Sequence, residues 1–375
     1  MRISSVFDAG NILVKSASNP ADIRLEIEKD NGSDFYQWFY FRLTGAKDQV
    51  VRMTIENAGG AAYPKGWEGY EAVASTDREV WERIPTTYTD GKLVLEHKPD
   101  GDAVWFAYFA PYSMTRHDEL IAACQQSGQV RLDVIGTTLD GRDMDRLIVG
   151  EPGKGKKTVW VIARQHPGET MAEWAAEGLL TRLLDETDPV ARDLLDRAVF
   201  HVVPNMNPDG SFRGHLRTNA KGINLNREWD KASQANSPEV FAVLEEMKKT
   251  GVDLFLDMHG DEALPYNFIA GAEGVPSFTE EDARLLNAYK EALASINPDF
   301  QTRHGYPVDK PGTADLSIAT NWMAETFRCL AMTLEMPFKD NADMPEPSEG
   351  WSPDRSMKMG ASQLDAMRAV LHRLK

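Results

Sequence analysis

The chain has 375 residues, of which 42% are hydrophobic and 26% are charged, a composition typical of folded globular protein that excludes intrinsic disorder. It carries 41 Lys and Arg residues against 58 Asp and Glu residues, so its formal net charge is −17. This charge argues against a nucleic-acid partner, and without a run of about 18 apolar residues we expect no membrane span.

The cellular compartment is indicated by the N-terminus and the cysteines. The first residues lack the apolar core of a secretory signal peptide. Cys124 and Cys329 are too few for a disulfide framework, and we expect both to lie in hydrophobic cores. A cytoplasmic location fits these features.

The N-terminal third contains short runs rich in β-branched and aromatic residues, separated by turn residues. These runs are 35–43, 49–56, 92–96 and 103–109. Such runs predict an all-β sandwich of antiparallel strands, which we place at residues 1–117. No catalytic motif stands out there, so we expect this domain to shape access to a site rather than its chemistry.

The pattern changes from about residue 118 onward. Nearly continuous apolar runs predict buried strands at 158–163, 199–203, 254–258 and 330–334. Amphipathic or capped segments predict helices at 171–184, 237–250 and 279–296, and a last helix after Ser352-Pro353. Alternating strands and helices indicate an α/β domain at 118–375, with a mixed, mainly parallel sheet.

Potential metal ligands follow the predicted strands. His166 and Glu169 come just after the first strand, His259 directly follows the third, and Glu335 ends the fourth. Ligands of open α/β sheets bind outside the carboxyl ends of the strands, so these side chains are expected to converge. Two His and one Glu that leave a position open for water form a catalytic zinc set, and we predict one zinc ion per chain.

A set of motifs then points to a known family. His-Pro-Gly-Glu at 166–169, Asn-Pro-Asp-Gly at 207–210, Arg-x₄-Gly-x-Asn-Leu-Asn-Arg at 217–227, Asp-Met-His-Gly at 257–260 and Thr-Leu-Glu at 333–335 appear in this order. In this the chain resembles the zinc metallocarboxypeptidases. It is most similar to their cytosolic carboxypeptidase branch, in which an all-β domain precedes the catalytic one; the segment Trp38-Phe39-Tyr40-Phe41 also resembles that branch.

The resemblance implies a role for each matching residue. His166, Glu169 and His259 would hold zinc. Glu335 would be the general base for the water molecule and then pass its proton to the leaving amine. Arg217 would stabilise the developing oxyanion.

The resemblance also implies a binding site for the substrate's end. Asn226 and Arg227 would bind the terminal carboxylate of the substrate. The family's mobile tyrosine corresponds best to Tyr306. In the loop 312–315, Asp315 would form an acidic floor of the specificity pocket, which disfavours a C-terminal Glu side chain and favours Lys or Arg.

The predicted function is therefore hydrolysis of the C-terminal peptide bond of peptides or proteins. Two alternatives stay open. Related zinc enzymes remove acyl groups from N-acyl amino acids, and a third possibility is a peptide-binding protein without activity. The complete ligand set together with Glu335 argues against the last.

Overall fold

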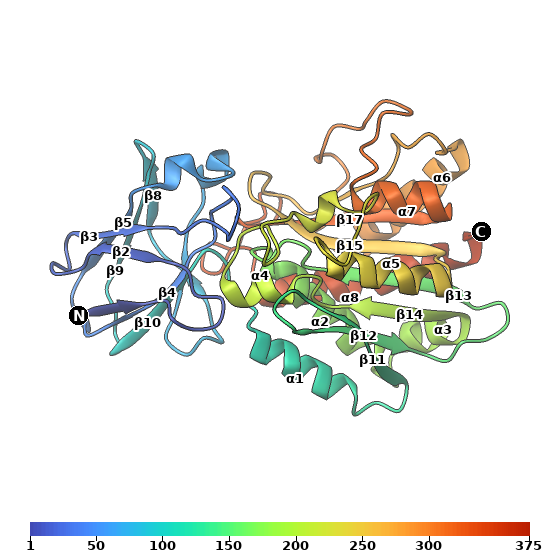
Figure 1. Cartoon of the computed structure of the whole chain (residues 1–375), viewed down its shortest axis with the longest axis horizontal. Helices are drawn as coiled ribbons and strands as arrows, with labels where there is room; N and C mark the ends of the chain where they lie inside the picture. Colours follow the sequence, from blue (N-terminus) through green and yellow to red (C-terminus); the bar gives the residue numbers. More distant parts are fainter.

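The computed structural model describes residues 1–375, and Figure 1 shows an all-β part at the N-terminal end beside a larger α/β part. The two chain ends lie at opposite ends of the molecule (Figure 1). Both the β-sandwich and the α/β fold predicted from the sequence are confirmed.

The sandwich consists of two five-stranded sheets. In sheet order, the first contains β1 (Arg2–Ser4), β4 (Tyr40–Thr44), β10 (Ala103–Ala107), β6 (Val73–Ser75) and β7 (Glu82–Arg83). The second contains β2 (Leu13–Ser16), β3 (Ile23–Glu26), β5 (Val51–Ile55), β9 (Lys92–His97) and β8 (Thr86–Thr89). Two short 3-10 helices lie in the connections, Ala58–Gly60 with three residues and Pro64–Trp67 with four.

One strand pair departs from the predicted antiparallel arrangement, because β3 and β5 run parallel. A parallel pair needs a crossover rather than a hairpin. Here the crossover passes through β4 in the other sheet. Within β5, Val51 and Met53 are fully buried and Arg52 is exposed, but Thr54 is buried too.

The α/β part is built on a seven-stranded mixed sheet. Its four central strands are parallel to one another, and all four were predicted: β14 (Ala198–Val203), β13 (Lys157–Ala163), β15 (Leu254–Asp261) and β17 (Leu330–Pro337). The three outer strands are each antiparallel to their inner neighbour: β11 (Val130–Thr137) at one edge, β12 (Asp143–Val149) next to it and β16 (Phe268–Ala270) at the other edge.

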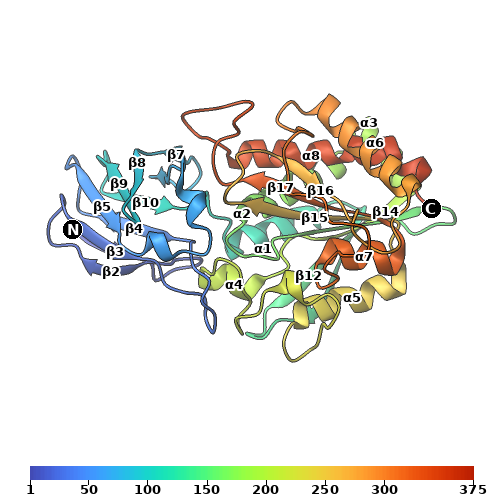
Figure 2. The same cartoon turned by 90° about the horizontal axis from the view of Figure 1, so that it is seen from above.

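Helices cover both faces of this sheet, as Figure 2 shows. One face carries α2 (Thr170–Leu183), α3 (Pro189–Arg197), α6 (Glu280–Ile296) and α8 (Pro353–Val370). The other carries α5 (Pro238–Thr250) and α7 (Ala319–Phe327). The remaining helical segments are α1 (Met114–Cys124), α4 (Pro208–Arg213) and two short 3-10 helices, Leu225–Arg227 and Leu371–Arg373.

The predicted helix starts have different physical origins. Thr279 forms a capping box with Asp282, and the Ser352 hydroxyl accepts a hydrogen bond from the Arg355 N–H. Ser237 lies at the N-cap position of α5 but does not cap it, and its hydroxyl donates to Glu228 instead.

The two parts share one continuous hydrophobic core of 78 buried residues. At their junction the ring of Tyr108 stacks on that of Phe338, with centroids 4.5 Å apart. The boundary expected at residues 117/118 falls inside α1, so that division stays a prediction. No helix has the length and apolarity needed to cross a lipid bilayer.

A buried ionic network joins α1 to the sheet and to α2. His117 Nδ1 lies 2.7 Å from Glu173 Oε1, and His117 Nε2 lies 3.3 Å from Asp145 Oδ2. The other oxygen of Glu173 accepts hydrogen bonds from Arg164 at 2.7 Å and from Asn205 at 3.0 Å. Burial lowers the pKa of His117, but the two carboxylates outweigh it and raise the pKa to about 9.

This network predicts a loss of stability at alkaline pH. Because its pKa is raised in the folded state, His117 contributes stability that is complete below about pH 6.5 and is lost as the pH rises through about 9. The contribution should be about 2–3 kcal/mol. Urea unfolding of the wild type and of His117→Gln between pH 6 and pH 10 measures this contribution. The difference between their free energies of unfolding should shrink as the pH rises.

Exposed His372 provides the control, since His372→Gln should keep the pH dependence of the wild type. A gap between wild type and His117→Gln that stays constant over this range would contradict the assigned charge on His117.

Candidate active site

The first site segment begins with a strained turn at the end of β13. Arg164 has a φ of 59°, a left-handed conformation that costs about 1–2 kcal/mol for a residue with a Cβ atom. Its buried side chain stabilises the turn by donating hydrogen bonds to the carbonyls of Tyr112 and Pro167 and to Glu173. The turn directs the next residues, including His166, away from the sheet.

Three side chains converge beyond this turn. Glu169, at the N-terminus of α2, lies with its two oxygens 2.7 Å from His166 Nδ1 and 2.7 Å from His259 Nδ1. The three potential ligand atoms all lie within 4.8 Å of one another, and each residue is at most 3% exposed. This cluster matches the set predicted from the sequence.

The donor set fits a zinc ion. Burial, followed by the positive charge of Arg217, lowers the pKa of His166 to about 3, which leaves a neutral imidazole with a lone pair to offer. Burial also acts to lower the pKa of His259, but Asp257 and Glu169 outweigh it and raise that pKa well above its ordinary value, so a bound metal ion would take the place of a proton there. Two imidazole nitrogens and one carboxylate are ligands that zinc prefers, and they leave a coordination position open.

Further contacts fix the two imidazole rings. His166 Nε2 lies 3.1 Å from Asn224 Oδ1, and His259 Nε2 lies 2.9 Å from Asp257 Oδ2. Asp257 in turn accepts a hydrogen bond of 2.6 Å from Gln165. Such partners orient metal-binding histidines and set the tautomer.

The sequence analysis missed these supporting residues. Asp257 could have been found, because it lies two residues before His259 on the same strand and so on the same face. Asn224 was within a quoted motif, but nothing in its spacing to His166 predicted the contact.

Glu335 lies beside the cluster, since β17 pairs with β15 in a register that places Glu335 opposite His259. It is 6% exposed, and its Oε2 atom has no hydrogen-bond partner. Burial raises the pKa of Glu335 well above its ordinary range, and neighbouring Glu169, Asp261 and Glu262 act in the same direction.

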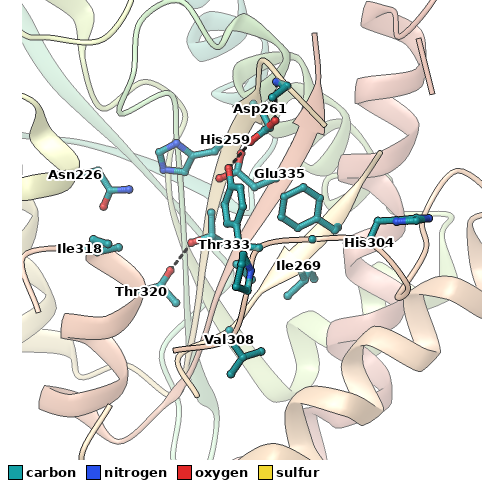
Figure 3. Close-up of a pocket in the computed structure, with 18 of the residues that line it drawn as sticks. Asn226, His259, Asp261, Ile269, His304, Val308, Ile318, Thr320, Thr333 and Glu335 are labelled. Carbon is teal, nitrogen blue, oxygen red and sulfur yellow. Dashed lines mark hydrogen bonds between the residues drawn. The ribbon is translucent and has the colours of Figure 1, made fainter. Parts of the chain in front are cut away.

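These residues surround one cavity of about 610 Å³, which Arg217, Asn226, Arg227 and Tyr306 also line. Figure 3 shows His259, Asp261 and Glu335 on one side of it and Asn226 across from them. The oxygen of the Asn226 amide accepts a hydrogen bond from the Ala319 N–H at 2.8 Å, so its amide nitrogen remains available to the cavity.

Two of the predicted site residues, Tyr306 and Asp315, form polar contacts with other residues of the chain. Tyr306 donates its hydroxyl to Asp261 at 2.6 Å, the bond that the dashed line at Asp261 marks in Figure 3. Asp315 does not line the cavity; it accepts hydrogen bonds from the N–H and the hydroxyl of Ser317 and lies 4.0 Å from Arg227 Nε. The pocket-floor role of Asp315 therefore stays a prediction without a supporting contact.

Comparisons with known proteins agree with this geometry. A family model described as the cytosolic carboxypeptidase N-terminal domain matches residues 3–109, and one described as zinc carboxypeptidase matches residues 119–359. Mouse cytosolic carboxypeptidase 6 is 26% identical over 300 residues, which cover 72% of this chain and 55% of the mouse protein. The chain thus spans about half the length of that relative.

Solved structures extend the similarity to the whole chain. A metallo-carboxypeptidase from Burkholderia cenocepacia is 49% identical, with a TM-score of 0.97 and full coverage of both chains. A metallo-carboxypeptidase from Pseudomonas aeruginosa, in complex with (2-guanidinoethylmercapto)succinic acid, is 46% identical, also with a TM-score of 0.97 and full coverage of both chains.

The cluster predicts which histidines are needed to bind metal. Replacing His166 or His259 by Ala should lower bound zinc from about one ion per chain to less than about a tenth, because each change removes one of three protein ligands. Elemental analysis after dialysis against trace zinc measures this. The matched control is His304→Ala, which removes a histidine that lines the cavity outside the cluster and should leave the zinc content unchanged. Full occupancy in both cluster variants would contradict the assignment.

Proposed function

The chain belongs to the zinc carboxypeptidase family and is an exopeptidase of that family, and we propose that it hydrolyses the C-terminal peptide bond of peptides or proteins with a single zinc ion held by His166, Glu169 and His259. One observation carries this proposal. A single cavity joins a metal-binding cluster, a buried carboxylate with an unpartnered oxygen and two arginines.

Zinc, when bound, acidifies a water molecule and polarises the substrate carbonyl. Glu335 accepts a proton from the attacking water at its unpartnered Oε2 and then delivers it to the leaving amine. The buried position of this carboxylate beside the metal cluster suits the exchange, because the proton can stay on Glu335 between the two transfers.

The two arginines have separate tasks in this proposal. Arg217, whose Nη1 atom lies 3.9 Å from Glu169 Oε1 and so close to the cluster, stabilises negative charge on the former carbonyl oxygen. Arg227 is farther out and half-exposed, and it binds the substrate's terminal carboxylate together with the amide nitrogen of Asn226. Binding of that carboxylate restricts cleavage to the last residue.

Tyr306 is proposed to close over bound substrate, as the family's mobile tyrosine does. It is 46% exposed and is held by its hydroxyl on Asp261 and by the ring of Phe268, with centroids 4.9 Å apart. Few contacts would need to break for its ring to turn toward the substrate.

The last substrate residue is proposed to be basic. Away from the zinc cluster, the cavity is lined by the carboxylates of Glu273 and Asp309 and by the ammonium group of Lys290, which lies 3.6 Å from Glu273. Arg303 also lines the cavity, but its guanidinium is paired with Asp343, which does not line it. An excess of carboxylates favours a cationic side chain and repels a carboxylate. The ligand named in the Pseudomonas aeruginosa complex combines a guanidino group with a dicarboxylic acid, which suits such a cavity.

The setting of this activity is proposed to be the cytoplasm. Both cysteines are free thiols, and Cys124 is buried, which supports a reducing compartment.

The function can be tested by incubating the zinc-loaded protein with peptides and with N-acyl amino acids of the same last residue, with products identified by mass. We expect stepwise loss of C-terminal residues from the peptides, and loss of activity with a metal chelator. Turnover of the N-acyl amino acids alone would support the deacylase alternative, and no turnover of either would support a binding protein.

Glu335→Gln should retain zinc and substrate binding but lose activity. The amide has nearly the same shape yet cannot accept the proton, and loss of a general base costs about 10²–10⁴ in rate. Steady-state kinetics beside zinc analysis measures both properties. Glu349→Gln, which changes an exposed carboxylate away from the cavity, is the matched control. Activity of Glu335→Gln within a few-fold of the control would point to another base.

A peptide series with twenty different last residues tests the preference. Lys and Arg ends should be released about tenfold faster than Glu ends, because like charges meet in the second case. Glu273→Gln should reduce that advantage, whereas Asp315→Asn should not, because Asp315 does not line the cavity. Faster release of Glu than of Lys and Arg by the wild type would refute the basic preference.

A further inference from the structure

The loop formed by residues 214–222, here called the Arg217 loop, is held on one side by the N-terminal sandwich. Asn11 donates a hydrogen bond to the Gly214 carbonyl at 2.9 Å, and the Asn31 N–H donates to His215 Nε2 at 3.1 Å. At the far end of the loop, Gly222 has a φ of 80°, and a Cβ atom there would lie 2.5 Å from the Gly32 carbonyl oxygen. The loop belongs to no sheet, and the α/β part holds it on the other side. Gly168 donates its N–H to the Leu216 carbonyl at 2.9 Å, and the Asn236 carbonyl accepts a hydrogen bond from Asn219 at 3.0 Å.

One carboxylate of the sandwich determines the backbone at Arg217. Asp30 is 2% exposed and accepts the N–H groups of three successive residues, Leu216 at 2.7 Å and Arg217 and Thr218 at 2.9 Å each. It also accepts the Thr218 hydroxyl at 3.0 Å. Successive N–H groups around one anion form a concave binding site, and hydrogen bonds to an ionised acceptor are about twice as strong as neutral ones.

Two aromatic rings of the sandwich hold the Arg217 side chain. The guanidinium carbon lies 5.7 Å from the ring centre of Phe35 and 5.4 Å from that of Tyr63. A cation above an aromatic face is attracted to it. The guanidinium makes no hydrogen bond within the chain, so these rings and the 3.9 Å approach to Glu169 define its place.

Tyr63 is itself fixed and lines the cavity. Its N–H donates to Gln37 Oε1 at 2.8 Å, and its carbonyl accepts from Gln37 Nε2 at 3.1 Å. Gln37 is fully buried and also donates to the Tyr108 hydroxyl at 3.0 Å. The ring is thus supported from within the sandwich.

We propose that the N-terminal sandwich is part of the catalytic centre, with Asp30 positioning the backbone and Phe35 and Tyr63 positioning the side chain of Arg217. This inference rests on the proposed function of Arg217. Asp30 and the two rings are positioning residues, since they act through the arginine. The sandwich then contributes to the rate of the chemical step as well as to the shape of the entrance.

The test is Asp30→Asn, which keeps the shape but replaces one acceptor oxygen by a donor group. Amide hydrogen exchange at residues 216–218 should become about tenfold faster, because their N–H groups lose acceptors. The kcat should fall about 10- to 100-fold with KM within about threefold of wild type, because a transition-state contact is misplaced. In the Arg217→Ala background the same change should alter kcat by less than about twofold.

Asp8→Asn is the matched control. Asp8 also lies in the sandwich, and its carboxylate accepts the Met114 N–H of the α/β part at 2.7 Å rather than an N–H of the Arg217 loop. This variant should keep wild-type kcat, zinc content and exchange at residues 216–218.

A second pair of variants probes the rings without changing Asp30. Tyr63→Leu should lower kcat, and Tyr63→Phe should restore most of the loss, because it keeps the ring beside the guanidinium. This pair supplies the kinetic test if Asp30→Asn does not fold.

Three outcomes would overturn the proposal. They are an unchanged kcat in folded Asp30→Asn, an equal loss in the Arg217→Ala background, and unchanged exchange at residues 216–218. The exchange measurement needs no turnover. A wild type that cleaves no peptide would therefore refute the proposed function. The exchange measurement would still show whether Asp30 holds the backbone at residues 216–218.

Discussion

The structure depends on a buried excess of negative charge that requires a cation. Glu169, Glu262 and Glu335 lie close together at the cavity with exposures of 6% or less, and the Arg217 guanidinium approaches Glu169 only to 3.9 Å. Burying an uncompensated charge costs several kcal/mol, so such a cluster is unfavourable in a protein alone. A doubly charged ion among these carboxylates removes that cost and inverts the local pattern of pKa values.

The sheet brings this charge together through its register. Parallel pairing of β15 and β17 sets His259 opposite Glu335, and the pleat sets Asp257 on the same face as His259. The strained turn at Arg164 then directs His166 and Glu169 over the ends of the same strands. Chemistry-bearing residues that are distant in sequence thus meet because the buried strands that precede them are adjacent.

How well a feature could be predicted depends on how far apart in the sequence the interacting residues lie. Buried strands and the Thr279 cap could be predicted, because they depend on residues within a few positions of one another. Ligand residues just after such strands could be predicted to converge. Contacts between the sandwich and the Arg217 loop could not, since Asp30 and Leu216 are separated by 186 positions and neither shows a local signal. The loop conformation around Asp315 depends on hydrogen bonds to Ser317 that the spacing alone did not indicate.

The proposed function requires that the cavity, with zinc bound, holds a free C-terminal carboxylate and that the bond next to it is cleaved. It is tested most directly by comparing one peptide with its C-terminally amidated twin under the zinc-loaded protein, with products identified by mass. We expect stepwise removal of single residues from the free acid and a rate at least about 10²-fold lower for the amide, because Arg227 loses its ionic partner. Equal rates for both peptides, or cleavage at internal bonds, would contradict it.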